Sequence, residues 1–193
     1  KRLVFDEILA NLLVLSKIRS RIKKIKKSVK FFNNFLSKNL ISNFNFNLTD
    51  NQREIIDEIN KDLKSENKMF RLLQGDVGSG KTIIALIAAS NVIESNYQVA
   101  FMAPTEILAK QHYELAKKIF KKTNIKISLL LGSTNYSERK KIINDLLNGK
   151  IKLLIGTHAL FQKNIFFDKL GLVIIDEQHK FGVKQRINLS DKG

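Results

Sequence analysis

Gly75-Asp76-Val77-Gly78-Ser79-Gly80-Lys81-Thr82 is the stretch that decides the fold of this chain. It matches the pattern G-x-x-x-x-G-K-T, in which glycines allow backbone N–H groups to wrap around a polyphosphate. In this pattern Lys81 adds a positive charge for the β- and γ-phosphates, and the hydroxyl of Thr82 ligates Mg²⁺. We therefore expect residues 75–82 to bind ATP together with Mg²⁺.

The residues on either side of this loop fit a strand followed by a helix. Residues 70–73 are strand-like, and residues 82–94 are helix-like. A helix that begins at the loop points its positive N-terminal end at the phosphates, which favours anion binding. This context favours a nucleotide site over a simple glycine-rich turn.

A second candidate site follows the apolar run at residues 172–175, which ends in Asp176 and Glu177. At the C-terminal edge of a parallel sheet, these carboxylates would face the same crevice as the phosphate loop. Asp176 is then placed to hold Mg²⁺, and Glu177 to orient or deprotonate the attacking water. A strand that ends in Asp-Glu is weak evidence alone, but its pairing with the phosphate loop favours the catalytic interpretation.

Apolar runs and helical stretches alternate after residue 49, which predicts an α/β fold with a parallel sheet flanked by crossover helices. The expected strands are residues 70–73, 99–102, 127–131, 153–155 and 172–175. The expected helices are residues 82–94, 106–120 and 137–147, the last closed by Gly149. Thr49 and Gln52 have the spacing of a capping box, which starts another helix with an apolar face at Ile55, Ile56, Ile59 and Leu63.

The N-terminal segment, residues 1–42, carries much of the charge: 11 Lys and Arg against 2 acids, or +9 of a total of +16. Apolar residues recur there at helical spacing from Ile18 to Leu36, which predicts a long basic helix over about residues 6–30. The helix could be a packed helix with a solvated basic face, a phosphate-contacting or domain-bridging helix, or a membrane-surface or calmodulin-target helix. The Asn-rich residues 39–48 fit an irregular domain boundary, so we expect a helical linker at 1–42 and a nucleotide-binding lobe at 43–193.

Composition excludes several classes of protein. The chain has 193 residues, no Cys, no Trp and one Pro, so disulfide-stapled modules and Cys-ligated zinc sites are excluded. No apolar run approaches the ~20 residues of a membrane span. The excess of 34 basic over 18 acidic residues suggests a polyanionic partner. Because the chain starts at Lys1 and stops at Gly193 without a closing element, we expect it to be a piece of a longer protein.

Several longer strings stand out in the sequence: Leu72 to Thr82, Met102 to Ala109 with Gln111-His112, Gly156 to Gln162, Asp176-Glu177-Gln178-His179, and Phe181-Gly182-Val183 with Gln185-Arg186. In content and order they resemble the RecG branch of superfamily 2 helicases. The resemblance covers roughly residues 46–193, and residues 2–19 resemble the helix that leaves the fork-binding wedge domain of that family. Transcription-repair coupling factors, the nearest relatives to exclude, have Glu in place of Gln178 and an aromatic residue in place of Ser79.

The resemblance implies a role for each matching residue. Gln52, with Thr49 and an aromatic at Phe44 or Phe46, resembles the adenine-reading motif, although the capping box accounts for Thr49 and Gln52 as well. Three pairs resemble DNA-backbone contacts: Pro104-Thr105, which Glu106 follows in the same motif, Gly132-Ser133 and Thr157-His158. Thr105 is also expected as a helix N-cap, and His158 could equally be a packing histidine. Gln178 resembles a γ-phosphate sensor, and His179 a residue that couples nucleotide state to DNA.

The resemblance therefore implies a RecA-like lobe of an ATP-dependent DNA helicase that remodels branched DNA, such as stalled forks, in recombination and repair. Its expected partners are ATP, Mg²⁺ and DNA, and it is expected to be monomeric in a bacterial cytoplasm, near the nucleoid. A related motor acting on RNA or RNA polymerase, and a non-catalytic basic DNA-binding module, remain alternatives. We expect this chain to end before the third motif of the family and to lack the second lobe, whose arginine would supply transition-state charge.

Overall fold

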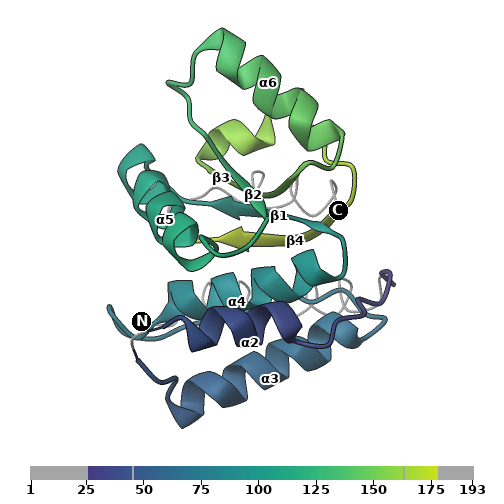
Figure 1. The fold of residues 1–193 in the computed structure, drawn as a ribbon, viewed down its shortest axis with the longest axis vertical. Coiled ribbons are helices and arrows are strands. Elements are labelled where there is room, and N and C mark those ends of the chain that lie inside the picture. Colours follow the sequence, from purple (N-terminus) through teal and green to yellow (C-terminus); the bar gives the residue numbers. More distant parts are fainter. Residues whose placement is uncertain (1–25, 45, 163, 178–193) are drawn as a thin grey trace, which may run out of the picture.

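The computed structural model describes residues 26–44, 46–162 and 164–177, where three helices come first and strands then alternate with helices (Figure 1). The elements in chain order are α2 (Phe35–Ser42), α3 (Asp50–Lys64), α4 (Lys81–Glu94), β1 (Gln98–Met102), α5 (Glu106–Ile119), β2 (Lys126–Leu130), α6 (Tyr136–Leu147), β3 (Ile151–Gly156), the 3-10 helix η1 (His158–Phe161) and β4 (Leu170–Ile175). The helices predicted at 82–94, 106–120 and 137–147 are confirmed, as are the four predicted strands from residue 99 onward.

The four strands form one parallel sheet in the order β2-β3-β1-β4. Their C-terminal ends are aligned in one row. Gly156 pairs with Leu130 on one side and Met102 on the other, and Met102 pairs with Ile175. Since neighbouring strands lie about 4.8 Å apart, the four segments that follow this row leave the sheet within roughly 15 Å of one another. The sheet therefore gathers all four C-terminal loops at one edge.

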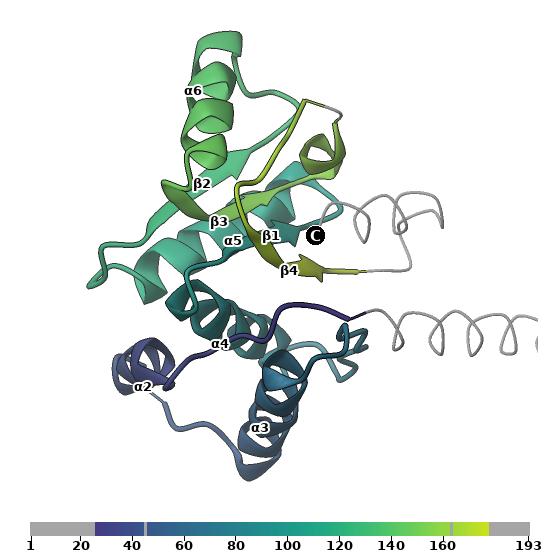
Figure 2. The same ribbon diagram turned by 90° about the vertical axis from the view of Figure 1, so that its right-hand side faces the viewer.

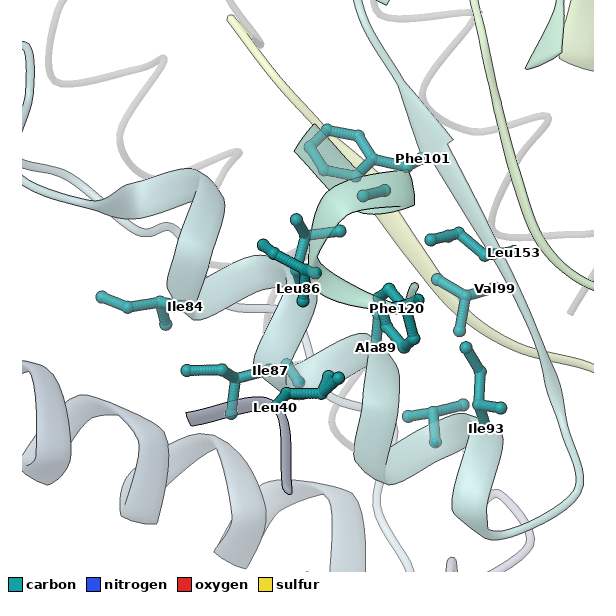
Figure 3. Packing of buried hydrophobic residues seen from close by; sticks show 14 of the residues in the cluster. Leu40, Ile84, Leu86, Ile87, Ala89, Ile93, Val99, Phe101, Phe120 and Leu153 are labelled. Carbon is teal, nitrogen blue, oxygen red and sulfur yellow. The ribbon is translucent and has the colours of Figure 1, made fainter. Parts of the chain in front are cut away.

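Helices cover both faces of the sheet, and the alternation of side chains along β1 explains how. Val99 and Phe101 face the cluster that contains α4 and the C-terminal part of α5, whereas Ala100 and Met102 face the cluster with α6 and η1. Figure 3 shows the first of these clusters, where α4 packs against the sheet. All five residues of β1 are buried, as expected for an inner strand covered on both faces.

Helices α2 and α3 form a further layer on the outer side of α4, away from the sheet (Figures 1 and 2). Leu40 of α2 and Leu63 of α3 are almost fully buried in the same core cluster as α4. Burying such a leucine contributes about 1.5–3 kcal/mol. This layer explains why α4 is buried along most of its length, including Ser90 and Asn91.

Local sequence signals fix where two of the helices begin and end. The capping box at the start of α3 is confirmed: Thr49 Oγ1 accepts a hydrogen bond from Gln52 N, and Gln52 Oε1 accepts one from Thr49 N. Helix α6 ends at Leu147 and is closed by Gly149, which has φ +67°, with Gly149 N donating to Leu146 O and Lys150 N to Asp145 O. These two bonds form a Schellman motif, for which a left-handed glycine is the favoured residue.

The predicted long basic helix is wrong in the part of it that the structure describes. Residues 26–33 are not helical, and Asn34 at φ +60° stands before α2 in a left-handed conformation that an α-helix cannot contain. Tertiary hydrogen bonds hold this segment in another conformation: the Lys27 ammonium donates to Leu63 O and Ser65 O, and Lys27 N donates to Glu66 O. Residues 1–25 lie outside the described residues.

The expected boundary near residue 42 does not coincide with a break in packing. Phe32 and Leu40 belong to the core cluster of the lobe, so residues 26–42 pack onto it and do not lead away from it. The expectation of an irregular segment at 39–48 is wrong for residues 39–42, which are the second half of α2.

The strand predicted at residues 70–73 is also absent from the described structure. These residues pair with no described strand, and the side chains of Phe70 and Leu72 are exposed. Leu73 still packs against the core cluster, so the chain approaches the phosphate loop along the lobe without joining its sheet.

Candidate nucleotide and nucleic-acid site

The phosphate loop has the backbone conformation that its glycines permit. Gly78 and Gly80 have φ of +83° and +84°, the left-handed region that residues with a Cβ rarely adopt. Gly80 is the N-cap of α4, so the helix begins at Lys81 directly after the loop. The free N–H groups of this first turn and the helix dipole favour an anion at this place. Residues 75–79 are exposed to solvent, as a ligand-binding loop requires.

Lys81 turns back over the loop. Its ammonium donates hydrogen bonds to Gly75 O and Asp76 O, each at 2.7 Å. The side chain therefore lies over the space around which the loop bends. Thr82, the next residue, is partly buried in the first turn of α4.

Gln52 lies against the phosphate loop while it caps α3. Its Nε2 donates to Ser79 O at 3.0 Å, and a Cβ on Gly80 would stand 2.6 Å from this nitrogen. One amide of Gln52 therefore supports both the start of α3 and the phosphate loop, whereas its role in adenine recognition stays a prediction. The two candidate aromatics, Phe44 and Phe46, stack on each other with ring centroids 5.0 Å apart.

Asp176 follows β4 and is anchored at three atoms. Its N donates to Met102 O, its Oδ1 accepts from Glu177 N at 3.0 Å, and its Oδ2 lies 2.8 Å from His112 Nε2. The hydrogen bond from His112 is the largest influence that lowers the pKa of this carboxyl; burial opposes it, and the charge of Lys81 adds to the lowering. This influence of Lys81 agrees with the prediction that Asp176 and the phosphate loop face the same crevice.

Glu177 has a left-handed backbone at φ +51° and is exposed. A left-handed non-glycine residue costs of order 1–3 kcal/mol, and such strain clusters at functional sites. Gln178 and His179, and the motif at Phe181–Arg186, lie outside the described residues. Their predicted roles stay predictions.

Mg²⁺ fits the donors that the chain offers. A hard cation of this kind takes one or two protein oxygens and completes its shell with phosphate oxygens and water. Thr82 supplies a hydroxyl and Asp176 a carboxylate, so these two residues would hold it. Across the described ranges, no cluster of three or more His, Cys, Asp or Glu forms a separate metal site.

The predicted DNA-contacting pairs follow β1, β2 and β3 at the C-terminal edge of the sheet. Thr105 is the N-cap of α5, with its Oγ1 accepting from Leu108 N, and is exposed. Gly132 and Ser133 are also exposed. Thr157 is buried, and its hydroxyl has no hydrogen-bond partner among the described residues, whereas His158 is exposed. The alternative of His158 as a buried packing histidine is therefore wrong.

Two of these loops are tied together by Glu106, which follows Pro104 and Thr105 in the predicted DNA-contacting motif but whose contact with Ser133 was not predicted. Its carboxylate accepts from Ser133 N at 3.1 Å and from Ser133 Oγ at 2.8 Å. These bonds lower the pKa of the Glu106 carboxyl. The loop after β2 is thus held against the start of α5.

His112 is a functional candidate to which the sequence assigned no role of its own. It lies on the buried face of α5 with Ala109, Ala116 and Ile119, and its ring stacks on Phe101 at 4.8 Å between centroids. The sequence could have indicated His112, because it is a titratable residue at a core-facing position of a helix. A buried polar side chain of this kind requires a hydrogen-bond partner.

Comparison with known proteins agrees with this geometry. The family model for DEAD/DEAH box helicases matches residues 49–192. The ATP-dependent DNA helicase RecG of Thermotoga maritima is 47% identical over 193 residues, covering 100% of this chain and 25% of that protein. RecG of Borreliella burgdorferi is 45% identical, covering 100% of the chain and 28% of that protein.

A solved structure described as RecG bound to a three-way DNA junction superimposes on 92% of the chain and 24% of that protein, with a TM-score of 0.84 and 46% identity. The chain spans about a quarter of the length of these relatives. The α/β lobe with its phosphate loop and parallel sheet is the fold predicted from sequence. By the match of its residues 49–192, the chain belongs to the DEAD/DEAH box helicase family.

Proposed function

We propose that this chain is the ATP-binding lobe of a DNA translocase that remodels branched DNA in recombination and repair, within a bacterial cytoplasm. One observation carries the proposal most directly. Asp176 follows β4 at the sheet edge where the loops after β1, β2 and β3 also leave the sheet, and Thr105, Ser133 and His158 in these loops are exposed. The relatives named RecG support DNA as the polymer that these loops contact.

In this proposal the chain performs four tasks. The first turn of α4 and Lys81 bind the β- and γ-phosphates. Thr82 and Asp176 hold Mg²⁺, which when bound neutralises charge on the phosphate oxygens. Glu177 orients the attacking water and accepts its proton. The loops around Thr105, Ser133 and Thr157 contact the DNA backbone, with affinity that falls as salt rises.

The decisive experiment compares ATP hydrolysis by the full-length protein and its Lys81→Ala variant, each with three-way junction DNA, duplex DNA or RNA. We expect junction DNA to stimulate hydrolysis most, and the substitution to abolish the stimulated rate. Stronger stimulation by RNA would instead identify an RNA motor. Unchanged remodelling of junctions by the Lys81→Ala variant would identify a DNA-binding module with a vestigial nucleotide site.

The separate chain of 193 residues should bind nucleotide weakly and unwind nothing. In other phosphoryl-transfer systems, loss of the arginine that stabilises the transition state costs on the order of 10³–10⁵ in rate. Brisk DNA-stimulated hydrolysis by these residues alone would contradict this expectation. Cytoplasmic location and a monomeric state are part of the proposal. No described helix is long and apolar enough to cross a membrane.

A further inference from the structure

His112 of α5 contacts the Asp176 carboxylate in a geometry that can orient this carboxylate as a metal ligand. His112 Nε2 lies 2.8 Å from Asp176 Oδ2, and the other carboxylate oxygen accepts from Glu177 N at 3.0 Å. An ionised carboxylate only accepts hydrogen bonds, so the proton of this contact resides on Nε2. Both oxygens of Asp176 are therefore held from the protein side, each with further lone-pair capacity for another partner.

The ring of His112 has little freedom to take another position. It is 8% exposed and stacks on the buried ring of Phe101, with an interplanar angle of 25°. Phe101 belongs to β1, the strand that pairs with β4 just before Asp176. The histidine is thus fixed by the same pair of strands that positions the carboxylate, and its hydrogen bond fixes the rotation of the Asp176 side chain.

We propose that His112 is a positioning residue, which orients the Asp176 carboxylate for Mg²⁺ in the nucleotide site. The inference rests on the proposed function, because it assigns the Mg²⁺ ligand to Asp176. Partners that hydrogen-bond a metal ligand typically contribute 10–100-fold to metal affinity or activity.

Three substitutions separate hydrogen bonding from packing. His112→Phe keeps an aromatic ring against Phe101 but removes the donor, and His112→Met removes the donor with a flexible chain. His112→Gln retains an amide N–H near the position of Nε2. The measurement is Mn²⁺ binding to the full-length protein with a non-hydrolysable ATP analogue, followed by electron paramagnetic resonance. Binding of the analogue without metal serves as the control for an intact phosphate loop.

We expect His112→Phe and His112→Met to weaken Mn²⁺ binding about 10–100-fold, with metal-free analogue binding unchanged. His112→Gln should restore Mn²⁺ affinity to within about threefold of the wild type. If either donorless variant that retains analogue binding holds Mn²⁺ like the wild type, the positioning role is wrong. Loss of Mn²⁺ binding in His112→Gln equal to that in the donorless variants would also overturn it, since packing alone would then explain the effect.

Two further variants distinguish this inference from the proposed function. Lys81→Ala should weaken binding of the analogue, and Asp176→Asn should weaken Mn²⁺ binding. If both have their expected effects but the donorless His112 variants do not, only the positioning role fails. If neither Lys81→Ala nor Asp176→Asn changes ligand binding, the nucleotide site itself is misassigned, and the inference fails with it.

Discussion

Gly156 should be intolerant of any side chain, because it lies in the row where the four strands end. A Cβ at this position would stand 2.1 Å from Leu130 O, 3.1 Å from Leu130 C and 3.1 Å from Leu160 Cδ2. Carbon and carbonyl oxygen approach to about 3.3 Å in favourable contacts, so strands β2 and β3 would have to separate by about 1.2 Å. The atom in the way belongs to the backbone of a paired strand, which cannot rotate aside.

The cost of Gly156→Ala follows from this separation. Overpacking costs about 1–3 kcal/mol, and the loss of one strand-pairing hydrogen bond adds about 0.5–1.5 kcal/mol. A total of about 2–4 kcal/mol is a large share of the 5–15 kcal/mol that stabilises a typical domain. We expect the loops after β2 and β3 to shift together, so DNA binding should weaken as well.

Hydrogen exchange measured by mass spectrometry is the sharpest assay of this prediction. Amides of β2 and β3 in Gly156→Ala should exchange about 10–1,000-fold faster, because each 1.4 kcal/mol changes an opening equilibrium tenfold. The matched control is Gly132→Ala, whose Cβ meets only Glu106 Oε1, at 3.4 Å, the end of a side chain that can move. Wild-type exchange rates in β2 and β3 of the Gly156→Ala protein would refute the reasoning.

Two other substitutions test Lys30, which is buried beside the core, and Gln52, which contacts the phosphate loop. Lys30 is buried against the Tyr97 ring, and burial, with repulsion from Lys27, lowers its pKa to about 8. The unfolded chain then binds more protons, so stability should rise by about 1 kcal/mol between pH 7 and 9. In Lys30→Met, urea denaturation should show higher stability at pH 7 and a flatter pH profile; an unchanged profile would contradict this. Gln52→Ala should lower ATP affinity, since Gln52 supports the loop at Ser79 and caps α3. If Gln52 also recognises the adenine base, Gln52→Ala should lower the affinity for ATP more than that for GTP in equilibrium titrations. Equal losses of affinity would mean that Gln52 only supports the loop.

The features that depend on chemistry between neighbouring residues could be predicted from the sequence. The phosphate loop needs its glycines, the capping box needs Thr49 and Gln52 three residues apart, and the helix over α6 needs Gly149 to end. Strand and helix periods placed β1 to β4 and α4 to α6, because those apolar residues pack against elements close in the sheet. Alternation of strands and helices also implied that Asp176 shares a sheet edge with the loops after the other strands, which is confirmed, but the strand expected before the phosphate loop is absent from the described structure.

Tertiary contacts explain what the sequence did not predict. The helical spacing of Val29, Phe32 and Leu36 suggested one helix, yet only Phe32 among these is fully buried, and Lys27 bonds to the end of α3. Such long-range hydrogen bonds override helical propensity, and they produce no periodic pattern in the sequence. The Asn33-Asn34 pair was the available sign of an interruption, because asparagine tolerates the left-handed region that Asn34 adopts. The contacts of Glu106 and His112 likewise join residues 27 and 64 positions apart, which no local pattern specifies.

The contacts of Glu106 and His112 connect α5 to both candidate sites, the DNA-contacting loop and the Mg²⁺ ligand. At one end Glu106 holds Ser133, in the loop that the proposal assigns to DNA; about 9 Å along the helix, His112 holds Asp176, which it assigns to Mg²⁺. A helix hardly changes length, so a shift of the helix along its axis would change both hydrogen bonds at once. Coupling of DNA to hydrolysis through α5 therefore requires two positions of one rigid element, each favoured by one ligand. The sheet register supports the same requirement, because Met102, which ends the strand leading into α5, also accepts the hydrogen bond from Asp176 N.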